Sequence, residues 1–303
     1  MSGAEQSDTG FTHPAFFYSG PEEYLAGVGG FVRSGLAAGA PVFVAVPPER
    51  LAALRDHLGS DADHAQLVNM AEMGRNPGRI LAALTDFADH HAAARPWLVG
   101  EPIWASRSPA EIREATRHEA LINLAFAGVP ATVLCPYDRA GLTADTLTGA
   151  ERTHPMLLNR ERTAPYADPL TINAECDILA GPEPAAAERL AFGPSYLHMV
   201  RRRAAEFGRA AGLTPERATD LKLAVGEAAA NTLRYGGGLG KIALWRNGPG
   251  VIAEIRDSGR LANPLAGRRR PPPDAPGGRG LWMIHQLCDL VELGPGLLRL
   301  HVS

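Results

Sequence analysis

Short apolar runs alternate with longer amphipathic stretches over the first 150 residues. The apolar runs predict buried β-strands and occur at 16–18, 42–46, 67–70, 97–99 and 131–135. Between them, residues 22–36 and 112–126 repeat apolar side chains at helical spacing. Buried strands that alternate with helices predict a mainly parallel sheet covered on both faces. The N-terminal part is therefore expected to be a three-layer α/β domain.

A proline-rich stretch with little periodicity follows, and it contains Pro165, Pro169, Pro182 and Pro184. Such a composition is typical of a domain junction. We therefore expect a first domain over 1–160, a linker over 161–186 and a second domain over 187–303.

Helices and strands come in blocks after this junction. A first helix that ends at Gly212 is predicted by one apolar stripe, made of Leu197, Val200, Ala204, Phe207 and Ala211. Thr214 and Pro215 predict the capped start of a second helix, which ends at the glycine run 236–238. A hairpin over 241–256 around Asn247 and Gly248, a helix over 281–289 and two strands complete the pattern. This order predicts an α+β sandwich.

Composition and charge exclude several function classes. The 303 residues carry a formal net charge of -3, which gives no long-range attraction to nucleic acid or to anionic membranes. No apolar run has membrane-spanning length, and the start MSGAEQSDTG lacks the basic and apolar regions of a signal peptide. The spacing of Cys135, Cys176 and Cys288 indicates neither a disulfide framework nor a structural zinc site. We expect a cytoplasmic protein with buried free thiols that binds proteins or small molecules.

Four polar and glycine-rich features of the second domain follow one another in an order that suits a nucleotide site. Glu227 and Asn231 share one face of the second helix, where Asn can ligate Mg²⁺ and Glu can accept a proton. Such a pair alone is most often a solvated helix face. Asp257 follows a strand and could hydrogen-bond an adenine amino group, with Gly259 allowing close backbone approach. The run 277–281 opens a helix whose N–H groups can hold phosphate.

A loop between these features contains Arg268, Arg269 and Arg270. It has the length of a mobile lid, whose arginines could touch phosphate or a partner protein. The alternative is a basic, proline-rich insertion without structure.

The segments ATDLKLAVGEAAANTLRYGGG, IAEIRDSG and GGRGLWMIHQLCDL resemble the GHKL (histidine kinase-like) ATPase superfamily, and within it the anti-sigma-factor kinase branch. The resemblance implies a Bergerat-type fold that binds ATP and Mg²⁺. It implies that Glu227 is the catalytic base and Asn231 the magnesium ligand. The implied nucleotide-binding residues are Asn231, Asp257, Gly259, Gly278, Arg279 and Gly280. Arg260 and Leu297 depart from the family pattern, where a glycine and a threonine are common.

The anti-sigma branch phosphorylates a serine on an antagonist protein and otherwise sequesters a sigma factor. The resemblance therefore implies a sigma factor or a STAS-type antagonist, or both, as partners, and a homodimer is a further expectation. The alternative is a non-catalytic module that only binds ATP or protein. A sensor histidine kinase is less favoured, because His198 lacks the usual phosphoacceptor motif and His118 is expected to be a surface histidine inside the first domain.

The first domain has no phosphate-binding loop, so we do not expect it to hydrolyse nucleotide. Its segments HPAFFYSGPEEYL, LVGEPIW, HEALINLAF, LCPYD and RTHP resemble the MEDS sensory domain, which implies a RecA-like fold. Ligands of open α/β sheets usually bind at the carboxyl ends of the strands. Glu101, Tyr137 and Asp138 follow the carboxyl ends of predicted strands, so a small-molecule pocket is expected there. His13, Glu119, Asn123 and His154 could join this pocket. A purely structural polar network is the alternative.

Overall fold

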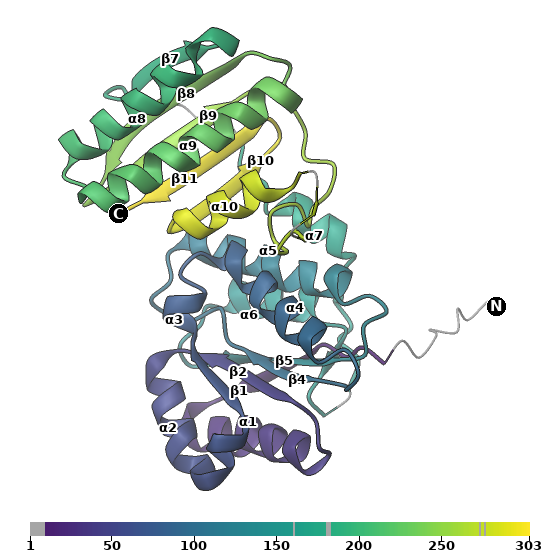
Figure 1. The fold of residues 1–303 in the computed structure, drawn as a ribbon. Coiled ribbons are helices and arrows are strands. Elements are labelled where there is room, and N and C mark those ends of the chain that lie inside the picture. The colour runs from purple at the N-terminus through teal and green to yellow at the C-terminus, as the bar shows by residue number, and fades with distance from the viewer. Residues whose placement is uncertain (1–9, 160, 180–182, 273, 276) are drawn as a thin grey trace. The chain divides into compact units, whose positions relative to one another are not determined.

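The computed structural model describes residues 10–159, 161–179, 183–272, 274–275 and 277–303. The chain forms two compact units (Figure 1). The first comprises the described residues up to Arg75 together with Ile80–Ile172, and the second comprises Asn76–Arg79 and Asn173–Ser303. The main division, after Ile172, falls inside the stretch that the sequence marks as a linker.

The first unit is built on a six-stranded parallel sheet with the strand order β3-β2-β4-β5-β1-β6. Its strands are β1 (Pro14–Tyr18), β2 (Val42–Val46), β3 (Gln66–Asn69), β4 (Trp97–Gly100), β5 (Thr132–Asp138) and β6 (Met156–Leu157). Its helices are α1 (Gly20–Ala37), α2 (Pro48–Leu58), α3 (Met70–Met73), α4 (Ile80–His90), α5 (Pro109–Ala125) and α6 (Ala144–Thr153). Helices α1 and α2 cover one face of the sheet, and α4, α5 and α6 cover the other (Figure 1). The predicted three-layer α/β domain is confirmed.

Local sequence explains these elements well. All five residues of β2 are buried, as the apolar run VFVAV requires of a strand covered on both faces. Helix α5 begins with a capping box, in which Ser108 and Glu111 satisfy each other's backbone N–H groups, and Pro109 occupies the first turn. Asn69 ends β3 and caps α3 by accepting from the Ala71 N–H at 2.9 Å. The predicted strand 67–70 therefore has the observed length but is displaced by one residue toward the C-terminus.

The surface position expected for His118 is wrong, because this side chain is only 1% exposed. Helix α5 packs between α4 and α6 as well as on the sheet, so it buries residues around most of its circumference. An amphipathic pattern with one polar face does not describe such a central helix.

The second unit is built on a five-stranded antiparallel sheet with the order β10-β11-β9-β8-β7. Its strands are β7 (Glu188–Phe192), β8 (Gly240–Asn247), β9 (Gly250–Arg256), β10 (Leu290–Gly294) and β11 (Leu297–Val302). Its helices are α8 (Leu197–Ala211), α9 (Pro215–Tyr235) and α10 (Arg279–Leu287), which lie together on one face of the sheet (Figure 1). The predicted α+β sandwich is confirmed.

Two elements near the junction were not predicted. Helix α7 (Pro169–Glu175) occupies part of the expected linker, and β7 adds an edge strand to the second sheet. Both are short and carry mixed apolar and charged residues, so their pattern is weak. The hairpin turn also differs, because Asn247 pairs with Gly250 and the turn consists of Gly248 and Pro249.

Helix α9 positions most of the candidate chemistry of the second unit. Thr214 caps it by accepting from the Arg217 N–H at 3.2 Å, and Pro215 opens its first turn. Leu221, Val225 and Thr232 are fully buried on the side that faces the core. This burial fixes the rotation of the helix and turns Glu227 and Asn231 toward the same cavity.

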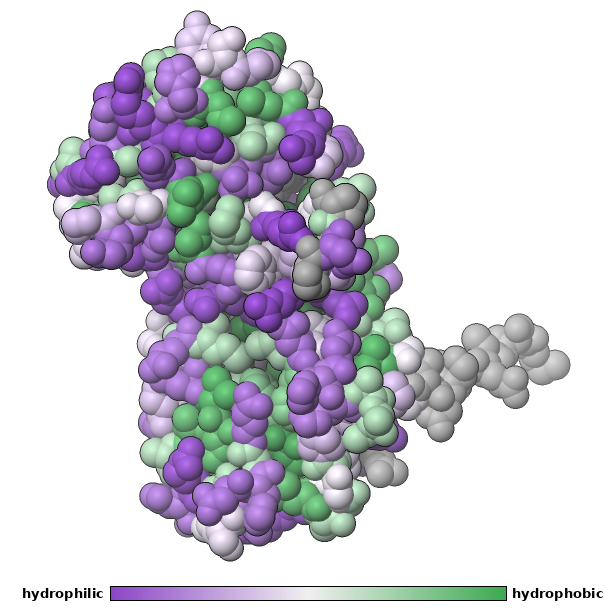
Figure 2. All heavy atoms as spheres, viewed as in Figure 1, coloured by the Kyte–Doolittle hydropathy of each residue, from purple (hydrophilic) through white to green (hydrophobic). Residues whose placement is uncertain are grey.

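The visible surface is largely hydrophilic, with smaller hydrophobic patches between polar residues (Figure 2). Within the described residues, no helix has both the length and the apolar character that crossing a bilayer requires. The three cysteines, all within the described part of the chain, are buried and form no disulfide bond with one another, as predicted.

Candidate functional site

A cavity of about 580 Å³ in the second unit is lined by residues from α9, the end of β9, the start of α10 and the β10–β11 hairpin. The lining includes all seven residues that the sequence assigns to a nucleotide site, namely Glu227, Asn231, Asp257, Gly259, Gly278, Arg279 and Gly280. The structure therefore brings together residues up to 53 positions apart in the chain. The volume is within the range of small-molecule sites.

Glu227 and Asn231 lie one helical turn apart on α9, and both side chains are partly buried. Gly280, in the first turn of α10, packs directly against them. A Cβ atom at Gly280 would lie 3.0 Å from Glu227 Oε2 and 3.6 Å from the Asn231 amide atoms. The absence of a side chain at this position keeps the carboxylate and the amide accessible from the cavity.

The N-terminus of α10 opens onto the same cavity. Its N-cap residue Gly278 has φ +86°, a left-handed conformation that favours glycine. No described side chain caps this end, so the N–H groups of the first turn remain available to a ligand. An uncapped helix start carries partial positive charge, which suits an anion such as phosphate. Arg279 adds a formal positive charge beside it.

Asp257 is held in one orientation at the end of β9. Its Oδ2 accepts from Thr232 Oγ1 at 2.7 Å, and its Oδ1 accepts from the Gly259 N–H at 2.8 Å. A Cβ at Gly236 would clash with the same carboxylate. Sequence reasoning identified Asp257 and Gly259 as site residues but did not identify Thr232, whose contact with Asp257 joins two separate elements.

Both residues that depart from the family pattern, Arg260 and Leu297, line the cavity. Leu297 is 5% exposed and presents a hydrocarbon surface where a hydroxyl is common.

Two arginines of the loop before α10, Arg268 and Arg270, differ in their surroundings. Arg268 is fully buried, and the Arg270 guanidinium lies 5.9 Å from the centre of the Trp282 ring.

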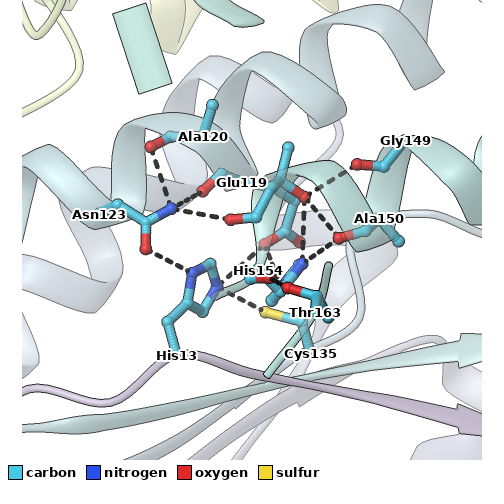
Figure 3. Close-up of polar contacts among 10 residues, drawn as sticks. His13, Glu119, Ala120, Asn123, Cys135, Gly149, Ala150, His154 and Thr163 are labelled. Carbon is cyan, nitrogen blue, oxygen red and sulfur yellow. Dashed lines mark hydrogen bonds and ion pairs between the residues drawn. The ribbon is translucent and has the colours of Figure 1, made fainter. Parts of the chain in front are cut away.

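In the first unit, the predicted pocket residues form two groups on opposite faces of the sheet. Glu101 follows β4 and Asp138 is the last residue of β5, and both lie on the α1–α2 face. His13, Glu119 and His154 gather on the other face, among α5 and α6 (Figure 3). The Tyr137 ring packs edge-on against His154 on that face. Adjacent residues of one strand point to opposite faces, so Tyr137 and Asp138 separate the two groups. The expectation of a single pocket does not describe this arrangement.

Comparison with protein-family models gives two matches. Residues 12–155 match the model of the methanogen/methylotroph, DcmR sensory domain, called MEDS. Residues 190–302 match the histidine kinase-like ATPase domain. The chain is a MEDS domain joined to a histidine kinase-like ATPase domain. A search of the curated proteins found no match.

An ATPase domain of this type implies ATP binding, usually with Mg²⁺. The residues present fit both. The cavity offers a fixed carboxylate acceptor at Asp257, an uncapped helix start for phosphate, and an amide and a carboxylate at Asn231 and Glu227. These donors and acceptors are of the types that adenine, phosphate and a hard cation require. The chain thus combines a sensory domain with a regulatory ATPase or kinase-like domain.

The group on the α1–α2 face of the MEDS domain surrounds Glu101. Its Oε1 accepts from the Tyr18 hydroxyl at 2.7 Å, and it is 2% exposed. Burial raises the pKa of Glu101 to about 8, although the Tyr18 hydrogen bond and the positive charge of Arg50 oppose this shift. Arg50 donates to Asp138 Oδ2 at 3.0 Å. The carboxyl ends of β1, β4 and β5 are therefore joined by a compact polar network.

In the group on the opposite face, the pKa values of His13, Glu119 and Cys135 are shifted in different directions. Burial, with a smaller contribution from His154, lowers the pKa of His13 from 6.5 to about 4. Burial acts to raise the pKa of Glu119, but its close contacts with the imidazoles of His13 and His154 outweigh this effect and hold that pKa well below its usual range. Burial and the Glu119 charge raise the pKa of the Cys135 thiol.

Proposed function

We propose that the chain is an anti-sigma-factor-type regulator whose ATPase domain binds Mg-ATP and phosphorylates a serine on an antagonist protein. The observation that carries this proposal is the convergence of Glu227, Asn231, Asp257 and the α10 N-terminus on one cavity. Each supplies a chemically distinct function that phosphoryl transfer needs, and they come from three separate elements.

The role of each group follows from its chemistry. Asp257 accepts a hydrogen bond from the adenine amino group, and Thr232 and Gly259 keep its carboxylate oriented for that contact. The α10 N–H groups hold the phosphates, and the Asn231 amide oxygen ligates Mg²⁺. Bound ATP would supply its γ-phosphoryl group to the serine oxygen and leave as ADP. Glu227 then accepts the proton of the attacking serine hydroxyl, while positioning and electrostatics lower most of the barrier.

The partner of this reaction is a STAS-type antagonist, and the sequestered partner is a sigma factor. The MEDS domain supplies the regulatory input in this proposal. A small molecule that contacts the Glu101, Arg50 and Asp138 network would alter the carboxyl edge of the parallel sheet, which is the usual ligand-binding edge of such folds.

A phosphotransfer assay tests the proposal. Full-length protein with Mg-ATP is incubated with purified STAS-type antagonists, and phosphoserine is detected by mass spectrometry. The expected result is serine phosphorylation by wild type and a loss of at least about 100-fold in Glu227→Gln, the size of a typical general-base contribution. Glu216→Gln, an exposed position in the first turn of the same helix, is the matched control and retains activity.

A non-catalytic binding module is the second candidate, and Leu297 and Arg260 favour it. Leu297 removes a hydroxyl from the cavity wall, and Arg260 adds a cation where a small residue is common. Binding of Mg-ATP without transfer to any antagonist, and with Glu227→Gln indistinguishable from wild type, would support this candidate over the kinase.

A further inference from the structure

Four side chains from four separate elements meet at one buried point of the MEDS domain (Figure 3). They are His13, just before β1, Glu119 on α5, Cys135 on β5 and His154 at the end of α6. None is more than 1% exposed. One ligand atom from each lies within 4.8 Å of all the others. Four groups of the zinc-ligand types thus share one small volume.

Three of the six distances between these atoms match those of a coordination shell. Glu119 Oε2 lies 3.3 Å from His13 Nε2 and 3.4 Å from His154 Nε2. His13 Nε2 lies 3.4 Å from Cys135 Sγ. A tetrahedral ion with bonds of about 2.0–2.3 Å holds its donor atoms about 3.3–3.8 Å apart. An ion at the centre would therefore reach all four atoms with small adjustments.

Hydrogen bonds at the far side of each imidazole fix which nitrogen carries the proton. His13 Nδ1 lies 3.1 Å from Asn123 Oδ1, and the Asn123 amide N–H₂ donates to the Thr153 carbonyl at 2.8 Å. His154 Nδ1 lies 2.7 Å from the Ala150 carbonyl oxygen. Because both partners accept, both Nδ1 atoms carry hydrogen. Each neutral ring then presents the Nε2 lone pair, the form that binds metals.

Without a cation this arrangement leaves lone pairs facing one another. Both Nε2 atoms approach the Glu119 carboxylate, which is itself an acceptor. Neither Glu119 oxygen nor His154 Nε2 has a hydrogen-bond partner among the residues that the structure describes. Buried acceptors without partners are costly, and they are rare in folded proteins.

We propose that His13, Glu119, Cys135 and His154 bind one zinc ion, through Nε2, Oε2, Sγ and Nε2 respectively. The mixed nitrogen, sulfur and oxygen donors suit a tetrahedral zinc-class transition metal, whereas Mg²⁺ and Ca²⁺ prefer oxygen alone. The carboxylate and the thiolate together balance the charge of Zn²⁺, so the buried site becomes neutral. With four protein ligands the zinc ion has no open coordination position for water or substrate. The bound ion would cross-link the start of β1, α5, β5 and the end of α6 and so stabilise the domain.

Cobalt substitution tests the site on the full-length chain, purified without a metal-binding tag and stripped with chelator. Wild type is expected to bind one Co²⁺ per chain, with the intense visible bands of tetrahedral cobalt and a thiolate-to-cobalt charge-transfer band. Zn²⁺ is expected to displace the cobalt and to raise the melting temperature of the MEDS domain. Cys135→Ser should lose the charge-transfer band and bind at least about tenfold more weakly, in line with the sensitivity of metal sites to ligand changes. Cys288→Ser, at a buried cysteine of the ATPase domain, is the matched control and retains the wild-type spectrum.

Asn123→Ala keeps all four ligands and removes only the partner of His13 Nδ1, so it tests the site even where Cys135→Ser fails to fold. Its affinity should fall about 10–100-fold, the usual effect of losing such an orienting group. Failure of wild type to bind Co²⁺ or Zn²⁺ would overturn the proposal, as would an unchanged cobalt spectrum in folded Cys135→Ser.

Discussion

Replacing Glu101 by glutamine should remove a pH dependence from the stability of the MEDS domain. Glu101 is buried, and its folded-state pKa of about 8 lies above its ordinary value of 4.5. The folded domain therefore holds this proton more tightly than the unfolded chain does. The resulting stability is complete below pH 4.5 and is lost as the pH rises through about 8. A gap of about 3.5 pH units, at about 1.4 kcal/mol per unit, corresponds to at most about 5 kcal/mol.

Glutamine keeps the shape of the side chain and can still accept from the Tyr18 hydroxyl, but it cannot ionise. Wild type should lose several kcal/mol of MEDS-domain stability between pH 5 and 9, by the same linkage, while Glu101→Gln should show a flatter profile. Amide hydrogen exchange in β4 and β5 reports this domain separately from the ATPase domain.

Glu22→Gln, an exposed carboxyl on α1, is the matched control and should keep the wild-type slope. A flat wild-type profile, or an unchanged slope in Glu101→Gln, would refute the assignment of the raised pKa to the buried carboxyl. Loss of folding at low pH in Glu101→Gln alone would also contradict it.

Three further predictions concern the ATPase domain. Thr232→Val should weaken nucleotide binding about tenfold in a fluorescent-nucleotide titration. It removes the hydrogen bond to the Asp257 carboxylate, and a bond of this kind contributes about 1.5–3 kcal/mol. Thr232→Ser keeps the hydroxyl and should bind nucleotide as wild type does. Gly280→Ala should weaken Mg-ATP binding by at least about tenfold in calorimetry, because the added methyl group lies 3.0 Å from Glu227 Oε2. The same substitution should lower the melting temperature by no more than a few degrees. Leu221→Ala should destabilise the domain by about 2–5 kcal/mol in urea denaturation, because the leucine is fully buried in the core; a loss below about 0.5 kcal/mol would contradict that packing.

The sequence pattern selected seven residues of the ATPase domain that the structure brings to one cavity. Local sequence alone predicts where the helices that carry these residues begin. Thr214 and Pro215 mark the start of α9, and glycines mark the start of α10. The supporting contact from Thr232 to Asp257 joins two elements and has no local signature.

The MEDS domain shows where such reasoning stops. His13, Cys135 and His154 lie far apart in the chain, and no short spacing links them, so cysteine spacing argued against a zinc site. The fold brings them together only because β1 and β5 are neighbouring strands and α6 leads back toward the same face. Tyr137 and Asp138 are neighbours in one strand, and neighbouring strand residues point to opposite faces of the sheet. This rule alone could have shown from the sequence that the two side chains do not share one pocket.

The central claim is that the ATPase cavity binds Mg-ATP through α9, Asp257 and the start of α10. Isothermal titration of wild type, Asn231→Ala and Asp257→Ala with ATP, in the presence and absence of Mg²⁺, tests it most directly. We predict saturable binding by wild type and loss of most of that affinity in Asp257→Ala. Asn231→Ala should lose the magnesium-dependent part of the affinity. No binding by folded wild type, or equal binding by all three proteins, would contradict the claim.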